Sequence, residues 1–195
     1  MTPALVVVDM LVDNLKSGEH TAIEREGMAI VPAIRRASEA LRRRGFPVIY
    51  ANDSFLPGDF LFGGRMKPHA LRGTPGAEVV PELEPAPGDI HLRKRRFSAF
   101  YKTDLDQTLR LLGVDTVAVA GITTPYCVLA TALDALAHDF RAVILEDATA
   151  AHKPEVHEAC LSLYRKSPLW PLLRVETVEA FLRHLEGGGD ASSGS

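Results

Sequence analysis

The stretch TVAVAGITTPYCVLATALDALAHD at Thr116–Asp139 decides the fold, because it joins a buried strand directly to an amphipathic helix. Its first part, Thr116–Gly121, is a short apolar and β-branched run of the kind that parallel strands with two covered faces show. After a Thr-Thr-Pro turn, apolar residues recur at helical spacing over Val128–His138. The stretch therefore predicts a strand–turn–helix unit of an α/β protein.

The same alternation runs along the rest of the chain. Similar short runs predict strands at Ala4–Asp9, Phe46–Asn52, Asp89–Arg93, Ala142–Glu146 and Leu172–Val175. Helical spacing predicts helices at Ile23–Arg44, Leu105–Leu112, Pro154–Lys166 and Thr177–Leu185, with Thr177 as a cap. We expect an α/β fold with a doubly wound, mostly parallel six-stranded sheet and helices on both faces, a Rossmann-like three-layer arrangement.

Length and composition point to one domain. A chain of 195 residues can bury one sizeable core, so we expect a single domain over residues 1–186 and a flexible tail over the glycine- and serine-rich residues 187–195. The net charge of −3 gives no general attraction to nucleic acid or to anionic membranes, and no apolar run is long enough to span a membrane. The N-terminus shows no secretory signal pattern, so we expect a cytoplasmic protein.

Polar side chains stand where the predicted strands end. These are Asp9 after the first strand, Asn52 and Asp53 after the second, Lys94 after the third and Cys127 after the fourth. In open parallel sheets the ligand binds outside the carboxyl ends of the strands, so these residues are the first candidates for chemistry. The region Ser54–Pro87 lacks clear periodicity, and we expect this long loop to cover the site.

Three of these residues make a nucleophilic constellation. Cys127 precedes a helix, where the helix dipole and free N–H groups should lower the pKa of its thiol. Lys94 could stabilise the thiolate, and Asp9 could take and return the proton.

Each residue also has a structural interpretation. Cys127 could be a buried small hydrophobe, Asp9 a loop cap, and Lys94 part of a solvated basic run at Arg93–Arg96. Cys160 is expected in the core, and His152 and His157 are expected in solvent because they lack metal-spaced partners. No phosphate-loop or dinucleotide-binding motif is present.

Four motifs resemble those of the isochorismatase-like cysteine hydrolases, the family of nicotinamidases and N-carbamoylsarcosine amidohydrolases. They are VVVDMLVD at Val6–Asp13, PHALRGTPGAEVVPEL at Pro68–Leu83, HLRKRRFSAFYKTDLD at His91–Asp106 and GITTPYCV at Gly121–Val128. The match covers nearly the whole chain. The resemblance implies that Asp9, Lys94 and Cys127 are the catalytic residues.

The resemblance also implies finer features of the site. It implies a cis peptide between Ile122 and Thr123, with the backbone N–H groups of Thr123 and Cys127 as the oxyanion hole. Pro125 departs from the usual polar residue of this turn. Family members are commonly oligomeric, so a homo-oligomer, a dimer or tetramer, is expected.

Two sets of positions bear on cofactor and substrate. Asp53 and His69 match metal-ligand positions of nicotinamidases, but Phe55 replaces a further histidine, so we expect no metal and no other cofactor. Asn14 and Met66 stand where nicotinamidases usually carry aromatic residues. The expected pocket residues are Asn14, Arg65, Met66, Phe97, Phe100 and Tyr126.

The sequence thus predicts a cysteine hydrolase that cleaves a C–N bond of a small non-peptide amide or ureido compound through a thioester on Cys127. The partner is a small-molecule amide, with no nucleic acid and no membrane. Alternatives are a nicotinamidase, an isochorismatase-type vinyl-ether hydrolase, or a non-catalytic α/β binding module that keeps only the fold. The presence of Cys127, Lys94 and Asp9 together favours the thiol enzyme.

Overall fold

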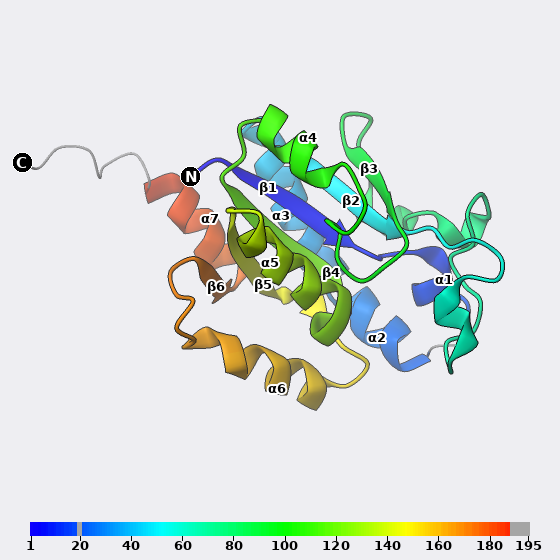
Figure 1. Cartoon of the computed structure of the whole chain (residues 1–195). Coiled ribbons are helices and arrows are strands. Elements are labelled where there is room, and N and C mark those ends of the chain that lie inside the picture. Colours follow the sequence, from blue (N-terminus) through cyan, green and yellow to red (C-terminus); the bar gives the residue numbers. More distant parts are fainter. Residues whose placement is uncertain (19–20, 188–195) are drawn as a thin grey trace, which may run out of the picture.

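In the computed structural model, which describes residues 1–18 and 21–187, six parallel strands form one sheet (Figure 1). The strands are β1 (Pro3–Val8), β2 (Val48–Asp53), β3 (Ile90–Lys94), β4 (Thr116–Ile122), β5 (Arg141–Ala150) and β6 (Leu173–Glu176). The α-helices are α1 (Val12–Leu15), α2 (Thr21–Ala29), α3 (Val31–Arg43), α4 (Leu105–Leu111), α5 (Leu129–Ala137), α6 (Pro154–Arg165) and α7 (Val178–Gly187). The predicted α/β fold is confirmed, and every strand pair is parallel.

Two hydrophobic cores lie on opposite faces of the sheet. Along β1, Val6 and Val8 face the core under α4, α5 and α6, whereas Leu5 and Val7 face the core under α2, α3 and α7. Figure 1 shows α5 and α3 on opposite sides of the sheet. Successive side chains of a strand point to opposite faces, so continuous apolar strands are needed when both faces are covered.

The strand order is β3-β2-β1-β4-β5-β6. The chain therefore builds outward from β1 in one direction and from β4 in the other, and the order reverses between these two central strands. Loops that leave β1 and β4 diverge to opposite faces there, which opens a crevice at their carboxyl ends. Of the polar residues predicted at the strand ends, Asp9, Asp53, Lys94 and Cys127 lie in this crevice.

The structure corrects two element boundaries. The predicted single helix over Ile23–Arg44 is two helices, because α2 ends at Ala29 and α3 restarts with Pro32 in its first turn, where a missing N–H costs nothing. Strand β5 is longer than predicted, since its pairing with β4 resumes at Thr149 after a register shift. Thr177 is confirmed as a cap, because its Oγ1 accepts the N–H of Ala180 at 3.1 Å.

The long region Ser54–Pro87 holds only short 3-10 turns, namely η1 (Phe60–Gly63), η2 (Pro75–Ala77) and η3 (Pro81–Leu83). It lies beside the carboxyl end of the sheet, next to α1 (Figure 1). Asp13 of α1 holds it there, because its Oδ2 accepts the N–H of Ala70 at 2.7 Å. Gly76 packs on the same carboxylate so closely that a Cβ would overlap it.

Two expectations concern the ends and surface of the chain. Gly187, the first residue of the predicted tail, is the last residue of α7, and residues 188–195 lie outside the described part. Among the described helices, none combines the length and apolar character needed to cross a bilayer.

Candidate active site

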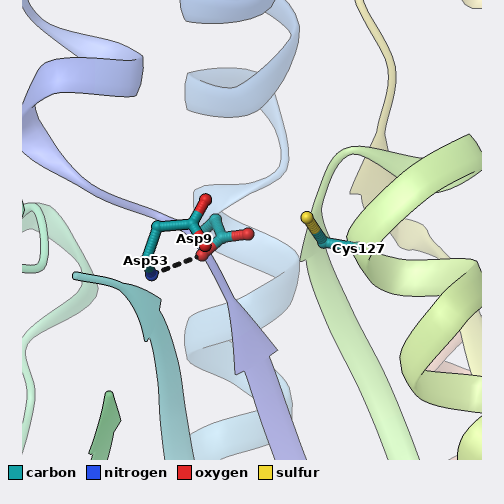
Figure 2. Close-up of side chains that lie close together, drawn as sticks. All are labelled: Asp9, Asp53 and Cys127. Carbon is teal, nitrogen blue, oxygen red and sulfur yellow. Dashed lines mark hydrogen bonds between the residues drawn. The ribbon is translucent and has the colours of Figure 1, made fainter. Parts of the chain in front are cut away.

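Asp9 occupies the crevice between β1 and β4. It follows β1 directly with a left-handed backbone at φ 54°, and its N–H donates to Ala51 O at 3.1 Å. The side chain turns toward β2, where Oδ1 accepts the N–H of Asp53 at 2.8 Å (Figure 2). Gly121 makes room at this point, because it has φ 105° and a Cβ there would overlap the carbonyl of Val8. Asp9 is therefore held by β2, and β4 leaves room beside the end of β1.

Lys94, the last residue of β3, reaches into the same crevice. Its side chain is fully buried, and Nζ donates to Asp9 Oδ2 at 2.7 Å, to Asp53 Oδ1 at 2.6 Å and to Arg96 O at 3.2 Å. The same nitrogen lies 3.6 Å from Cys127 Sγ. A buried ammonium is stable only with such partners.

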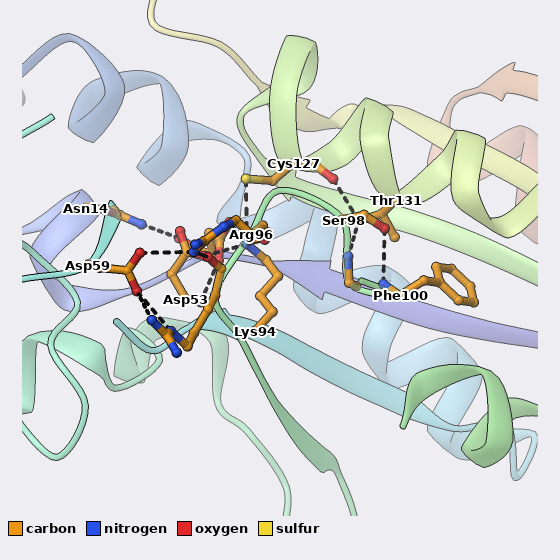
Figure 3. A network of polar contacts seen from close by, with 12 residues as sticks. Asn14, Asp53, Asp59, Lys94, Arg96, Ser98, Phe100, Cys127 and Thr131 are labelled. Carbon is orange, nitrogen blue, oxygen red and sulfur yellow. Dashed lines mark hydrogen bonds and ion pairs between the residues drawn. The ribbon is translucent and has the colours of Figure 1, made fainter. Parts of the chain in front are cut away.

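Cys127 lies in η4 (Thr124–Val128), a π-helical turn between β4 and α5. The peptide between Ile122 and Thr123 is cis, as predicted. Thr131 Oγ1 donates to Cys127 O at 2.7 Å and accepts the N–H of Ala99 at 3.0 Å. The turn is thus tied both to α5 and to the segment after β3, and Figure 3 shows Cys127 facing Lys94.

The structure brings the three predicted residues together. Asp9, Asp53 and Cys127 each offer an atom within 4.8 Å of the others, and Lys94 Nζ contacts all three side chains. These residues come from the ends of three strands and one turn that are far apart in the sequence. The arrangement provides a thiol, a carboxylate and a fixed cation in one place.

The charges in this group shift its pKa values. Burial alone would lower the pKa of Lys94, but the negative charges of Asp9 and Asp53 outweigh it and raise the pKa. Burial and the neighbouring Asp9 raise the pKa of Asp53 to about 6, against the opposing effect of Lys94. Lys94 therefore remains an ammonium, and the raised pKa of Asp53 makes its carboxylate easier to protonate than an exposed one.

The expected low pKa of Cys127 is wrong. Burial raises the pKa of this thiol well above its usual value, and the Asp9 carboxylate raises it further, while Lys94 only partly opposes them. An Asp9 carboxylate oxygen lies within 4.8 Å of the sulfur. The raised pKa favours the protonated thiol over the thiolate in the resting site.

A pocket of about 410 Å³ opens onto this group. Of the predicted pocket residues, Asn14, Arg65, Met66, Phe97 and Tyr126 line it, together with Thr123 and Cys127. The long region contributes six lining residues, which confirms that it covers the site: Phe55, Leu61, Arg65, Met66, Lys67 and His69.

Phe100 does not line the pocket, which corrects the prediction. Ser98 Oγ accepts the N–H of Phe100 at 3.1 Å, and this turn directs the ring away from Lys94 (Figure 3). The ring stacks on His138 at 5.0 Å and packs on Phe140 in the core below α5. The free energy is lower when the aromatic ring is buried in the core than when it is exposed in a polar crevice.

The metal-ligand positions of nicotinamidases do not fit a divalent cation here. Asp53 bonds Lys94 Nζ at 2.6 Å, so its carboxylate already neutralises a cation. Phe55 supplies no donor and packs edge-on against His69 with ring centroids 5.3 Å apart. The Lys94 ammonium lies among the same carboxylates that a metal would need.

Sequence reasoning missed two supporting contacts. The sequence places Asp53 at a strand end and at a metal-ligand position, whereas in the structure it lies beside Lys94 in the β2–β3 register and pairs with its Nζ. His157 of α6 was expected in solvent but is half-buried, and its Nδ1 lies 2.8 Å from Thr124 Oγ1 in η4. Nothing in the sequence indicates that α6 meets this turn.

Comparison with known proteins agrees with this geometry. The family model described as "Isochorismatase domain" matches residues 3–174. A solved structure of N-carbamoylsarcosine amidase from Thermoplasma acidophilum superposes with a TM-score of 0.80 at 36% identity, covering 92% of this chain and 98% of that one.

Two curated relatives differ in their described activity. A "probable inactive nicotinamidase" of Arabidopsis thaliana is 36% identical over 166 residues, covering 80% of this chain and 84% of the relative. A ureidoacrylate amidohydrolase of Methylobacterium radiotolerans is 32% identical over 188 residues, covering 83% of this chain and 72% of the relative.

Proposed function

The chain belongs to the isochorismatase family and is an amidohydrolase of non-peptide C–N bonds, and on that premise we propose that it cleaves a small carboxylate-bearing amide or ureido compound through a thioester on Cys127. The observation that carries the proposal is the position of Lys94 Nζ, 2.7 Å from Asp9 Oδ2 and 3.6 Å from Cys127 Sγ at one pocket. A cation between a thiol and a carboxylate stabilises the ion pair that forms when the proton moves.

In the acylation step, Asp9 takes the proton from Cys127 Sγ and the sulfur attacks the amide carbon. Lys94 cannot be the base, because the raised pKa keeps its ammonium protonated. The N–H groups of Thr123 and Cys127 hold the oxyanion of the tetrahedral intermediate. Asp9 then gives its proton to the nitrogen, the C–N bond breaks, and the amine leaves an acyl thioester.

In the deacylation step, water replaces the departed amine. Asp9 removes a proton from this water, and the hydroxide attacks the thioester carbon. The C–S bond breaks, Lys94 stabilises the thiolate, and Asp9 returns the proton to sulfur. The product acid leaves, and the resting thiol is restored.

The mouth of the pocket favours a substrate with a carboxylate. Arg65 lines the pocket and makes no ion pair with any residue that the structure describes. Arg96 lines the same pocket, and its guanidinium is paired with Asp59 at 2.9 Å. Asn14 and Met66 replace the aromatic residues that usually clamp a pyridine ring in nicotinamidases, so nicotinamide is the less favoured substrate.

The first experiment measures ammonia release over primary amides, ureido acids and nicotinamide, and then traps the intermediate on the best substrate. Acid quench and intact mass analysis should show an acyl adduct on the wild-type chain. Cys127→Ala should lose both adduct and turnover, and Cys160→Ala is the matched control, since Cys160 is the other buried cysteine and lies on α6.

Two outcomes separate the alternatives. Near-normal turnover of Cys127→Ala on a verified substrate would overturn the thioester mechanism. Absence of both turnover and adduct over the whole panel would favour the non-catalytic binding module.

A further inference from the structure

A second cavity shares the lining residue Arg96 with the amide pocket. It has a volume of about 290 Å³, and we call it the basic hollow; it is lined by Arg72, Arg93, Arg95, Arg96, Tyr101 and Lys102. Five of its six lining side chains are cationic. The whole chain carries a net charge of −3, so this concentration of positive charge is local.

Internal ion pairs do not neutralise the basic hollow. Arg95 and Arg96 share one buried carboxylate, Asp59, at 2.7 and 2.9 Å (Figure 3). The Arg72 guanidinium donates only to Ser54, and among the described residues Arg93 and Lys102 form no ion pair. One carboxylate thus pairs with two of the five cations, and the other three have no carboxylate partner among the described residues.

A cavity of similar size on α3 provides a contrast within the same chain. It measures about 280 Å³ and contains Arg35, Arg36 and Arg43. There Arg35 pairs with Glu84 at 2.8 Å, and Arg35 and Arg43 approach Glu39 at 3.8 and 3.9 Å. Glutamates balance most of the arginine charge in that cavity. In the basic hollow, Arg72, Arg93 and Lys102 have no carboxylate partner among the described residues.

We propose that the basic hollow binds a small multivalent anion of the phosphate class. Guanidinium forks match phosphate oxygens in paired hydrogen bonds, and several cations around a concave surface raise the local concentration of anions. The volume suits inorganic phosphate, pyrophosphate or the phosphate of a small metabolite. Arg93 and Lys102 are exposed and can turn toward the ligand.

The occupant would lie next to the catalytic group without entering it. Arg96 lines both cavities, and its carbonyl oxygen accepts from Lys94 Nζ at 3.2 Å. The amide pocket has its own cations, Arg65 and Lys67. Binding to the basic hollow must therefore be distinguished from binding of the same anion at the active site.

Isothermal titration of the full chain with inorganic phosphate and with pyrophosphate at low chloride concentration tests the proposal. We expect one site per chain, with pyrophosphate the tighter ligand. The double variant Arg93→Gln/Lys102→Gln should weaken binding by about a hundredfold, because two charge-assisted hydrogen bonds are lost. Arg65→Gln tests the amide pocket, and Arg36→Gln/Arg43→Gln removes the same charge from the cavity on α3; both should leave the Kd within about twofold of the wild-type value.

Three outcomes would overturn the proposal. The first is no saturable binding of either anion to the wild-type chain. The second is an equal loss of affinity in the Arg93→Gln/Lys102→Gln variant and in a control variant, which would assign the binding to net charge or to the amide pocket. The third is self-association of the wild-type chain without phosphate binding. If light scattering shows that the double variant abolishes this self-association, the surface binds a second copy of the chain.

Discussion

At the scale of single residues, the proton of Cys127 governs the reactivity of the site. Burial raises the pKa of this thiol most, and the negative charge of Asp9 raises it further. The same carboxylate that we propose as the base therefore suppresses the thiolate until it takes the proton itself. Loss of the Asp9 charge should therefore increase the rate of Cys127 alkylation but decrease the rate of hydrolysis.

Asp9→Asn should speed alkylation of Cys127 and stop turnover. Removal of the negative charge lowers the pKa of the thiol while Lys94 stays nearby, so iodoacetamide should react faster near pH 7, whereas hydrolysis should fall by about 10³-fold or more without the base. Peptide mapping with time measures the first effect, and Asp134→Asn on α5 is a control. Slower alkylation in Asp9→Asn would contradict the account.

Asp53 should make stability depend on pH. Its folded pKa is raised to about 6, so between pH 4 and 6 the folded state binds more protons than the unfolded state, and the free energy of unfolding falls as pH rises through this range. A shift of this size corresponds to about 3 kcal/mol. In urea titrations, Asp53→Asn should remove most of this fall.

The control for Asp53 is Asp104→Asn, which changes an exposed aspartate that caps nothing with its side chain. It should keep the wild-type pH dependence. An unchanged slope in Asp53→Asn would mean that other groups produce the pH dependence.

At the scale of elements, the nucleophile turn depends on contacts with α5 and α6. Turn η4 lies outside the regular hydrogen bonding of the strands and α-helices. Side-chain hydrogen bonds from Thr131 of α5 and His157 of α6 connect it to these helices. Thr131 also binds Ala99, in the segment that follows Lys94 at the end of β3. One buried hydroxyl therefore connects the thiol side and the cation side of the site.

Thr131→Val should weaken both stability and turnover. The change keeps the shape but leaves the buried N–H of Ala99 without its acceptor, which costs about 1–3 kcal/mol in unfolding free energy. Thr131→Ser keeps the hydroxyl and should restore kcat more than it restores stability. Equal kcat in the valine and serine variants would show that the hydroxyl does not position the turn.

At the scale of the whole molecule, one sheet joins the two hydrophobic cores. Each core contains alternate residues of the same strands. Loss of packing on one face of the sheet would therefore disrupt strands that also form the core on the other face. We therefore expect residues 1–186 to unfold in one cooperative transition. Coincident denaturation curves by circular dichroism and by tyrosine absorbance check this, and two separate midpoints would argue for more than one unit.

The sequence by itself determined the order of strands and helices, the residues at the strand ends and the family motifs, because periodicity and short motifs are local properties. It also placed Asp9, Lys94 and Cys127 at one edge, since parallel strands share their carboxyl end. The homo-oligomer stays a prediction.

Only the tertiary structure decided the inward turn of Phe100, the pairing of Asp53 with Lys94, the contact of His157 with Thr124 and the raised pKa of Cys127. The direction of a side chain in an irregular turn depends on which distant surface it can pack against. The pKa of a buried thiol depends on the sum of charges from strands that are separated in sequence, and that sum exists only after the chain has folded.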